Sequence, residues 1–169
     1  REATPPGFPG RVRLLTETDL VRILANTYYA DCEHRDAPDG KAIAAKLAEL
    51  EKEANRAPAQ TAPAPGVDDF EELWEYLENN FQAKPRVQEL RRNYRDRAPA
   101  IGPRLSLDRR IRLYSLIWNE TPAFTRVLRR LAEALEALGF PDAAYCPLAV
   151  LIPREHSIID VAALAALSE

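Results

Sequence analysis

Residues Leu105–Leu138 read LSLDRRIRLYSLIWNETPAFTRVLRRLAEALEAL, and this stretch decides the fold of the chain. It contains two runs of apolar residues at helical spacing, with a break between them. The spacing predicts two amphipathic helices that form a hairpin. The first run comprises Leu107, Ile111, Tyr114, Ile117 and Trp118, and the second comprises Phe124, Leu128, Leu131, Leu135 and Leu138.

The break carries residues that stop one helix and start the next. Thr121 can accept a hydrogen bond from the first free N–H groups of the second helix. Pro122 suits the first helical position, where its missing N–H is not needed. Gly139 tolerates the positive φ that commonly closes a helix. These signals predict helix boundaries at Thr121 and Gly139.

Four further helices are predicted outside the hairpin, each from an apolar stripe and a terminal signal. The first runs from Thr16 to about Ala30, with inward-facing residues Leu20, Ile23, Leu24 and Tyr28. The second is Lys41–Asn55, capped by Asp39, with Ile43, Leu47, Leu50 and Ala54 inward. The third is Asp68–Phe81, capped by Asp68 or Asp69, with Phe70, Leu73, Trp74, Leu77 and Phe81 inward. The fourth begins near Pro85 and carries Val87, Leu90 and Tyr94 until Ala98-Pro99.

Strands are few in this sequence. A short strand is predicted within Arg11–Thr16, where apolar residues partly alternate with arginines. Tyr145–Pro153 and Ser157–Val161 are short apolar runs, and each suits either a strand or a buried turn. Six helices and at most two or three short strands predict a mainly α, multi-helix, bundle-like domain.

The length of 169 residues predicts a single helical domain that spans residues 1–169. Ala57–Gly66 contains three prolines, which predicts a flexible linker. The chain has no methionine and begins at Arg1, so we expect a fragment of a larger protein. No apolar run reaches the roughly 18 residues of a membrane span. Cys32 and Cys146 favour reduced thiols in a cytoplasmic protein over a disulfide.

The charges are sorted along the chain, although the net charge is only −3. Residues 17–80 contain 15 acidic and 6 basic residues, whereas residues 84–130 contain 13 basic and 4 acidic residues. Such segregation is typical of helices that pack beside one another with complementary faces. It also occurs where a protein presents a charged surface to a partner.

The motifs of nucleotide-binding enzymes are absent from the sequence. Neither G-x-x-x-x-G-K-[ST] nor G-x-G-x-x-G occurs, and the six glycines are not clustered. Asp31–Asp36 gathers four metal-ligand residue types, but a solvated helix end explains this better than a zinc site. Ser115, Ser157 and Cys146 are possible nucleophiles, with His34 and His156 as possible bases, but no G-x-S-x-G motif occurs. His156 is next to Ser157, an adjacency that rarely yields triad geometry. We therefore predict no catalytic, cofactor-binding or metal-binding residue in this segment.

The arginines of helices 86–130 are the most suggestive set, because guanidinium groups contact carboxylates and phosphates in pairs. A basic stripe would suit nucleic acid. The acidic helices supply enough carboxylates to pair with these arginines instead, and the calculated pI is about 5.6. Intramolecular or protein–protein pairing is therefore favoured over nucleic acid. The candidate partner or phosphate contacts are Arg91, Arg92, Arg95, Arg109, Arg110, Arg126 and Arg130.

Residues 12–29, VRLLTETDLVRILANTYY, resemble a segment of the SrfC-type bacterial virulence factors. The resemblance continues in Leu113–Trp118, Tyr145–Leu148 and Ser157–Val161. Those factors are large proteins regarded as dynamin-like P-loop NTPases, whose phosphate-binding loop lies upstream of this region. The resemblance implies that the segment is a helical part of such an NTPase. No nucleotide-binding residue can be carried over, because the matching motif is missing here.

We therefore expect a non-catalytic helical module of a bacterial NTPase-like virulence factor, acting in partner contact or conformational coupling. Its partner would be another protein or the remainder of the parent NTPase. The resemblance implies that the intact protein is an ATPase or GTPase that uses ATP or GTP with Mg²⁺, while this segment needs no cofactor. The alternative is a nucleic-acid-binding module that uses the Arg-rich helices 86–130.

Overall fold

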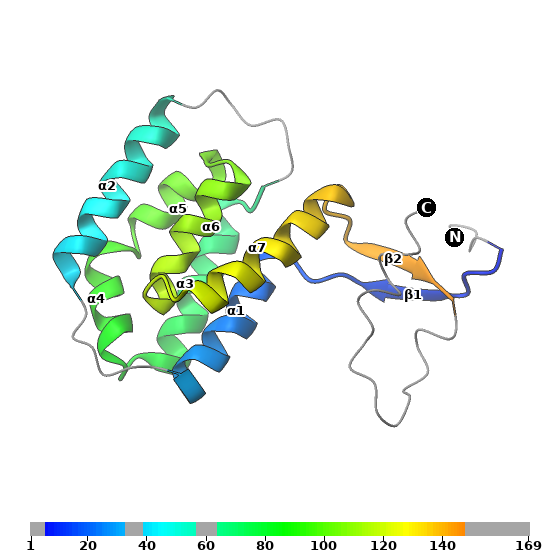
Figure 1. Ribbon diagram of the computed structural model, residues 1–169, viewed down its shortest axis with the longest axis horizontal. Coiled ribbons are helices and arrows are strands. Elements are labelled where there is room, and N and C mark those ends of the chain that lie inside the picture. Colours follow the sequence, from blue (N-terminus) through cyan, green and yellow to red (C-terminus); the bar gives the residue numbers. More distant parts are fainter. Residues whose placement is uncertain (1–5, 33–38, 57–63, 148–169) are drawn as a thin grey trace. The chain divides into compact units, whose positions relative to one another are not determined.

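A computed structural model describes residues 6–32, 39–56 and 64–147, and within these ranges the protein is mainly α (Figure 1). The predicted fold class is confirmed. The chain divides into two compact units. The smaller unit includes the described residues up to Leu14 and those from Pro141, and the larger, helical unit is Leu15–Phe140.

The described part of the helical unit contains seven α-helices, one more than the sequence predicts. They are α1 (Glu17–Thr27), α2 (Gly40–Arg56), α3 (Val67–Phe81), α4 (Pro85–Asn93), α5 (Arg97–Ile101), α6 (Leu107–Ser115) and α7 (Pro122–Ala137). Three short helical turns accompany them: the π-helical η1 (Tyr28–Cys32) and the 3₁₀-helical η2 (Gly102–Arg104) and η3 (Leu116–Trp118). The linker residues 57–63 lie outside the described ranges.

The smaller unit contains an antiparallel strand pair, β1 (Gly10–Arg13) and β2 (Ala143–Cys146). Gly10 lies opposite Cys146, and Arg13 lies opposite Ala143. The strand expected near the N-terminus is thus confirmed. Of the two C-terminal runs left open by the sequence, Tyr145–Pro153 contributes its first residues to β2, and Ser157–Val161 falls outside the described residues.

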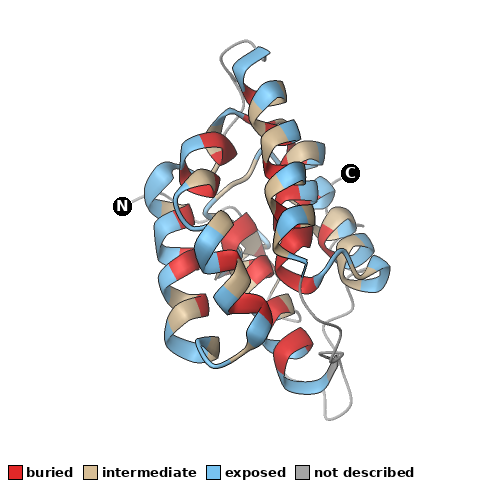
Figure 2. Ribbon diagram, turned by 90° about the vertical axis from the view of Figure 1, so that its left-hand side faces the viewer, coloured by how far each residue is buried: buried red, intermediate tan, exposed pale blue. Residues whose placement is uncertain are grey.

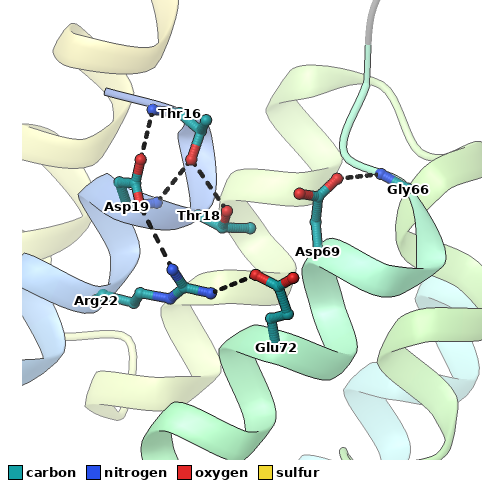
Figure 3. A network of polar contacts seen from close by, with 7 residues as sticks. All are labelled: Thr16, Thr18, Asp19, Arg22, Gly66, Asp69 and Glu72. Carbon is teal, nitrogen blue, oxygen red and sulfur yellow. Dashed lines mark hydrogen bonds and ion pairs between the residues drawn. The ribbon is translucent and has the colours of Figure 1, made fainter. Parts of the chain in front are cut away.

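Helix α1 begins with the predicted cap. The Thr16 Oγ1 atom accepts a hydrogen bond from the Asp19 N–H at 3.1 Å, and the Asp19 carboxylate accepts one from the Thr16 N–H at 3.0 Å. Figure 3 shows this reciprocal capping box. The same figure shows Arg22 between Asp19 and Glu72 of α3, at 3.4 and 3.3 Å. Local capping and one ion pair to α3 therefore fix the start of the chain's first helix.

The N-terminus of α3 corrects a prediction. Neither Asp68 nor Asp69 is the N-cap residue, because the helix begins one residue earlier and Gly66 occupies that position. Asp69 instead lies in the first turn and accepts a hydrogen bond from the Gly66 N–H at 2.7 Å (Figure 3). In contrast, Asp39 caps α2 as predicted, since its Oδ1 atom accepts from the N–H groups of Lys41 and Ala42.

The segment after Pro85 forms two helices where the sequence predicts one. Helix α4 ends at Asn93, and α5 begins four residues later. Pro99 lies in the first turn of α5, where backbone N–H groups have no intrahelical acceptor, so its missing donor removes no hydrogen bond. Ala98 and Pro99 therefore belong to a second helix, α5, and do not end the helix before it.

The predicted hairpin is present as α6, η3 and α7, and α6 packs against α7. Asn119 and Glu120 turn the chain through left-handed backbone conformations, with φ of 52° and 55°. Pro122 is the first residue of α7, and Gly139 has a φ of +76°, as predicted. The predicted role of Thr121 is wrong: its hydroxyl donates to the Trp118 carbonyl at 2.6 Å and does not cap α7.

The core lies where the inner faces of the helices meet (Figure 2). Every predicted inward residue of α2 and of the first hairpin run is buried. Tyr29 donates to the Ile117 carbonyl at 2.7 Å, and Phe70 stacks on Tyr114 with ring centres 5.5 Å apart. Two predicted core residues are exposed instead: Ile23 on α1 by 49% and Leu138 after α7 by 53%.

Candidate interaction surface

The seven candidate arginines lie on three helices and fall into two groups. Arg91 and Arg92 are on α4, with Arg95 just after it, Arg109 and Arg110 are on α6, and Arg126 and Arg130 are on α7. The arginines of α4 and α6 contact carboxylates of the protein itself. Those of α7 form no such pair within the described part of the chain. The structure therefore does not bring the seven together as one basic stripe.

Arg110 is the most buried of the candidates. Its Nε and Nη2 atoms donate to the two carboxylate oxygens of Glu17 at 2.8 and 3.0 Å, and Nη1 donates to the Leu105 carbonyl at 2.6 Å. Both side chains of the ion pair are only 2% exposed. Arg110 therefore joins the first turn of α1 to α6 and has no surface to offer to a partner.

Three more candidates are paired across or along helices. Arg109 contacts Glu53 of α2 at 2.8 Å, and Arg91 forms an ion pair with Glu78 of α3. Arg92 contacts Glu89 of its own helix at 2.7 Å. Arg95 is 3.9 Å from the neighbouring, 94% exposed Asp96, a contact that solvent screens strongly.

Arginines outside the candidate set extend the same pattern. Arg97 donates to both carboxylate oxygens of Glu51 at 2.6 and 2.8 Å, which lowers the pKa of Glu51 and raises the pKa of Arg97. Arg112 reaches Glu49 at 3.2 Å, and Arg129 reaches Asp108 at 2.6 Å. The acidic residues 17–80 thus pair extensively with the basic residues 84–130, which confirms the packing of complementary faces that the sorted charges indicate.

Arg86 lies at the start of the Arg-rich segment 86–130 and is a buried cation on α4. Its Nε and Nη2 atoms donate to the Leu116 carbonyl at 3.0 and 2.7 Å. Burial lowers the pKa of Arg86, since removal from water disfavours the charged form. The last turn of the α6–η3 segment leaves carbonyl groups without intrahelical donors, and Arg86 supplies one of the missing donors from α4.

Arg126 and Arg130 of α7 differ from all of these. Arg126 and Arg130 are exposed and lie one turn apart on the outer side of the helix. Arg129, between them in sequence, points instead toward α6, where it contacts Asp108. Close to these two arginines, Val127 is 44% exposed. The outer side of α7 therefore combines unpaired positive charge with exposed apolar surface.

The described residues add no support for the metal ligands and nucleophiles considered in the sequence analysis. Within the described ranges, no group of three or more His, Cys, Asp or Glu residues could hold a metal ion. Glu33–Asp36, His156 and Ser157 lie outside those ranges. Cys146 is a buried free thiol, and the Ser115 hydroxyl donates to the Arg112 carbonyl at 2.7 Å.

A comparison with family models gives one match, which covers residues 1–169 and carries the description "Putative bacterial virulence factor". The chain belongs to this family. No curated protein and no solved structure matches it. Membership in the virulence-factor family agrees with the broader part of the resemblance seen in the sequence. It assigns no role to any of the residues described above.

Two features of the virulence-factor chain were missed by sequence reasoning. Ile23 and Leu138 follow the helical spacing of core residues, yet they are exposed, and no signal in the sequence distinguishes them. The contrast between paired and unpaired arginines was also not predictable, since partners such as Glu17 and Arg110 are 93 residues apart. A further finding concerns membranes: among the described helices, none is long and apolar enough to cross a bilayer.

Proposed function

We propose that this chain is a non-catalytic helical module of a bacterial NTPase-like virulence factor, and that it serves partner contact or conformational coupling. The observation that carries the proposal is the division among its arginines. Those of α4 to α6 mostly pair with carboxylates on other elements or on their own helix, whereas Arg126 and Arg130 on α7 are exposed and unpaired in the described structure. The paired arginines stabilise the helix arrangement, and the outer side of α7 is left to meet a partner.

Conformational coupling has support in the way the chain passes between its two units. Strand β1 is followed directly by α1, and α7 is followed directly by β2. Helices α1 and α7 pack against each other, and the Tyr28 and Phe124 rings meet edge to face with centres 5.7 Å apart. The strand pair is thus joined by short segments of chain to two helices that contact each other. A parent protein could use this connection to transmit a change from one part to another.

The NTPase association rests on the resemblance to the SrfC-type, dynamin-like P-loop proteins. In this proposal ATP or GTP with Mg²⁺ belongs to the intact protein, whose remainder would be one partner of the module. Such a protein would act in the bacterial cytoplasm, with delivery to a host cell as a further possibility.

The nucleic-acid alternative is less well supported. Nucleic-acid affinity depends on several cations that can all reach the phosphate backbone. Of the seven candidate arginines, Arg110 is buried and three others contact carboxylates, so a phosphate would compete with these internal partners. Arg126, Arg130 and the weakly paired Arg95 are the residues through which the alternative would have to act.

Two measurements test the proposal. The first is the coding sequence upstream of Arg1, where a G-x-x-x-x-G-K-[ST] loop is expected; a start codon directly before Arg1 would remove the link to an NTPase. The second is phosphate release by the purified chain with Mg²⁺ and ATP or GTP, and the heat-unfolded chain is the control. We expect release equal to the control. Turnover that scales with the concentration of folded chain contradicts the non-catalytic assignment.

A further inference from the structure

We propose that the outer side of α7, together with Ile23 of α1, is a docking surface for an acidic amphipathic helix of a partner protein. This inference names the partner class for the proposed partner contact and so rests on the proposed function. The first observation behind it is the spacing of apolar residues on α7. Val127, Leu131, Ala134 and Leu138 follow one another at intervals of four, three and four residues, the spacing at which helices pack side by side.

Helix α7 carries two such apolar rows, and only one of them is buried. The inner row is Phe124, Leu128, Leu131 and Leu135, in which Leu128 is fully buried and the others pack against the core. The outer row, which we call the α7 seam, is Val127, Leu131, Ala134 and Leu138. Val127 and Leu138 are 44% and 53% exposed, and Ala134 is also exposed. Leu131 belongs to both rows, so the seam is continuous with the core.

Contacts on either side of α7 show where the seam lies. Arg129 pairs with Asp108, so that flank of α7 faces α6. Phe124 contacts Tyr28, so the opposite flank faces α1. At about 3.6 residues per turn, Val127 projects between the α1 flank and the outer side of α7. The seam therefore runs along the side of α7 next to α1, over about three turns or roughly 16 Å.

Helix α1 adds apolar surface beside the seam. Figure 1 shows α1 and α7 side by side and running in opposite directions, and their packing agrees with this view. Since Tyr28 lies against Phe124, Ile23 is level along the helix axis with the middle of α7. Arg22 and Asn26 contact Glu72 and Tyr76 of α3, whereas Ile23 is 49% exposed.

The charges around the seam select an acidic partner. Arg126 and Arg130 lie on the outer side of α7, flanking the seam, and neither pairs with any described residue. The acidic Glu133 lies toward the α6 flank, where Arg129 approaches it at 3.8 Å. A helix laid on the seam would thus meet apolar side chains along its centre and two positive charges along one edge. The complementary ligand is an amphipathic helix with apolar residues at i, i+3 or i+4 and i+7, and with Asp or Glu on one flank.

The test uses a fluorescent synthetic helix of about three heptads with Leu at the apolar positions and Glu on the flanks. A twin peptide carries Lys in place of Glu. Binding to the full chain is followed by fluorescence anisotropy at about 0.05 M and about 0.5 M NaCl. We expect the acidic peptide to bind in the micromolar range and more weakly at high salt, and we expect the basic twin to bind at least about tenfold more weakly.

Two variants examine the surface itself. Arg126→Glu/Arg130→Glu should weaken binding of the acidic peptide about tenfold and improve binding of the basic twin, because the flanking charges are reversed. Val127→Asp should weaken both peptides by placing a carboxylate on the seam. The matched control is Lys41→Glu/Lys52→Glu, which reverses two exposed lysines of α2 with the same change in net charge and should leave affinity within about twofold. All of the substituted side chains are exposed, so the circular dichroism spectra of the variants should match that of the parent chain.

Several results overturn the inference. Absence of peptide binding, equal binding of both twins, or binding unaffected by Val127→Asp each removes the docking surface, while the proposed function keeps its separate tests. A dimer in light scattering that Val127→Asp converts to a monomer shows that a second copy of the chain covers the seam. Binding of a labelled oligonucleotide that is lost in Arg126→Glu/Arg130→Glu, with no peptide binding, rejects both this inference and the proposed function in favour of nucleic acid.

Discussion

Arg110 of α6 encloses the carboxylate of Glu17 in α1 with two hydrogen bonds, at 2.8 and 3.0 Å, inside the helical unit. The two residues are 93 positions apart in the sequence, and both are almost fully buried. Each charge is acceptable in the interior only because the other is present. The pair therefore ties the first helix of the chain to the central hairpin.

Removing one member of this pair should be strongly destabilising. Arg110→Met leaves the Glu17 carboxylate buried without its partner, so we expect the free energy of unfolding to fall by about 3–5 kcal/mol. Urea unfolding followed by circular dichroism measures the loss. The double variant Glu17→Leu/Arg110→Met should recover most of it, because no charge is then left unpaired. Arg92→Met, which breaks an exposed pair on α4, is the control and should change stability by less than about 1 kcal/mol. A double variant as unstable as Arg110→Met would show that packing, and not charge pairing, dominates at this site.

Gly102 is required because η2 passes directly over the ring of Phe70. A Cβ atom at position 102 would overlap that ring and would lie 2.7 Å from its Cε1 atom. Gly102→Ala should therefore lower the free energy of unfolding by about 1–3 kcal/mol through overpacking. Gly40→Ala is the control, because its Cβ would closely approach Oε2 of Glu89 at 2.5 Å, the movable end of a side chain, while the next atoms lie 3.6 Å away. Thermal unfolding of both variants compares the two sites, and equal Tm values would contradict the close approach of η2 to α3.

The burial of the Tyr94 hydroxyl predicts a loss of stability at alkaline pH. Its hydroxyl is buried without a hydrogen-bond partner among the described residues, and burial raises the pKa of Tyr94 far above its usual value. Below pH about 10 the tyrosine is protonated in the folded and unfolded states alike. Above that pH the unfolded state releases the proton and the folded state keeps it, so stability should fall by about 1.4 kcal/mol per pH unit. Unfolding measured from pH about 9 to about 12 should show no such slope below pH about 10 and this slope above it, and Tyr94→Phe should reduce it. An unchanged slope in Tyr94→Phe would assign the alkaline loss to other groups, such as the buried Tyr114.

The ion pair of Glu51 with Arg97 predicts a smaller loss of stability at acidic pH. Hydrogen bonds from Arg97 lower the pKa of Glu51, so its contribution to stability is present at neutral pH and is lost as the pH falls below the ordinary value of about 4.5. The pair is partly exposed, and solvent screening should keep the effect below about 1 kcal/mol. Urea unfolding of Glu51→Gln should show lower stability than the parent at pH about 7 and a smaller difference at pH about 3. An equal difference at both pH values would contradict a contribution from the charged form.

Local signals in the sequence predicted the helix ends well. The Thr16 and Asp39 caps, Pro122 at the first position of α7 and Gly139 in a left-handed conformation are all found in the structure. These features depend on backbone groups within about four residues, which the sequence places side by side. There are three exceptions. Thr121 does not cap α7, because its hydroxyl bonds to the preceding Trp118 carbonyl. Gly66, and not Asp68 or Asp69, occupies the N-cap position of α3, and α4 and α5 form where one helix was predicted.

The helical spacing predicted the buried face of α2 correctly, but it predicted too wide a buried face for α1 and α7. All four inward residues of α2 are buried as expected. Ile23 and Leu138 have equally regular spacing, but the neighbouring helices leave them about half exposed. Periodicity gives the side of a helix, and the width of the buried stripe depends on how many helices pack against it.

The sequence by itself determined the mainly α fold, most of the helix ends and the separation of acidic from basic segments, because these depend on residue types and short spacings. Only the tertiary structure decided which arginines are neutralised and which are free. Arg110 pairs with Glu17, and Arg109 pairs with Glu53, because folding brings helices together that are distant in the sequence. Arg126 and Arg130 are chemically the same as those residues, but their positions on the outer side of α7 place them beyond the described carboxylates. The candidate surface is therefore a consequence of helix packing, which no local pattern records.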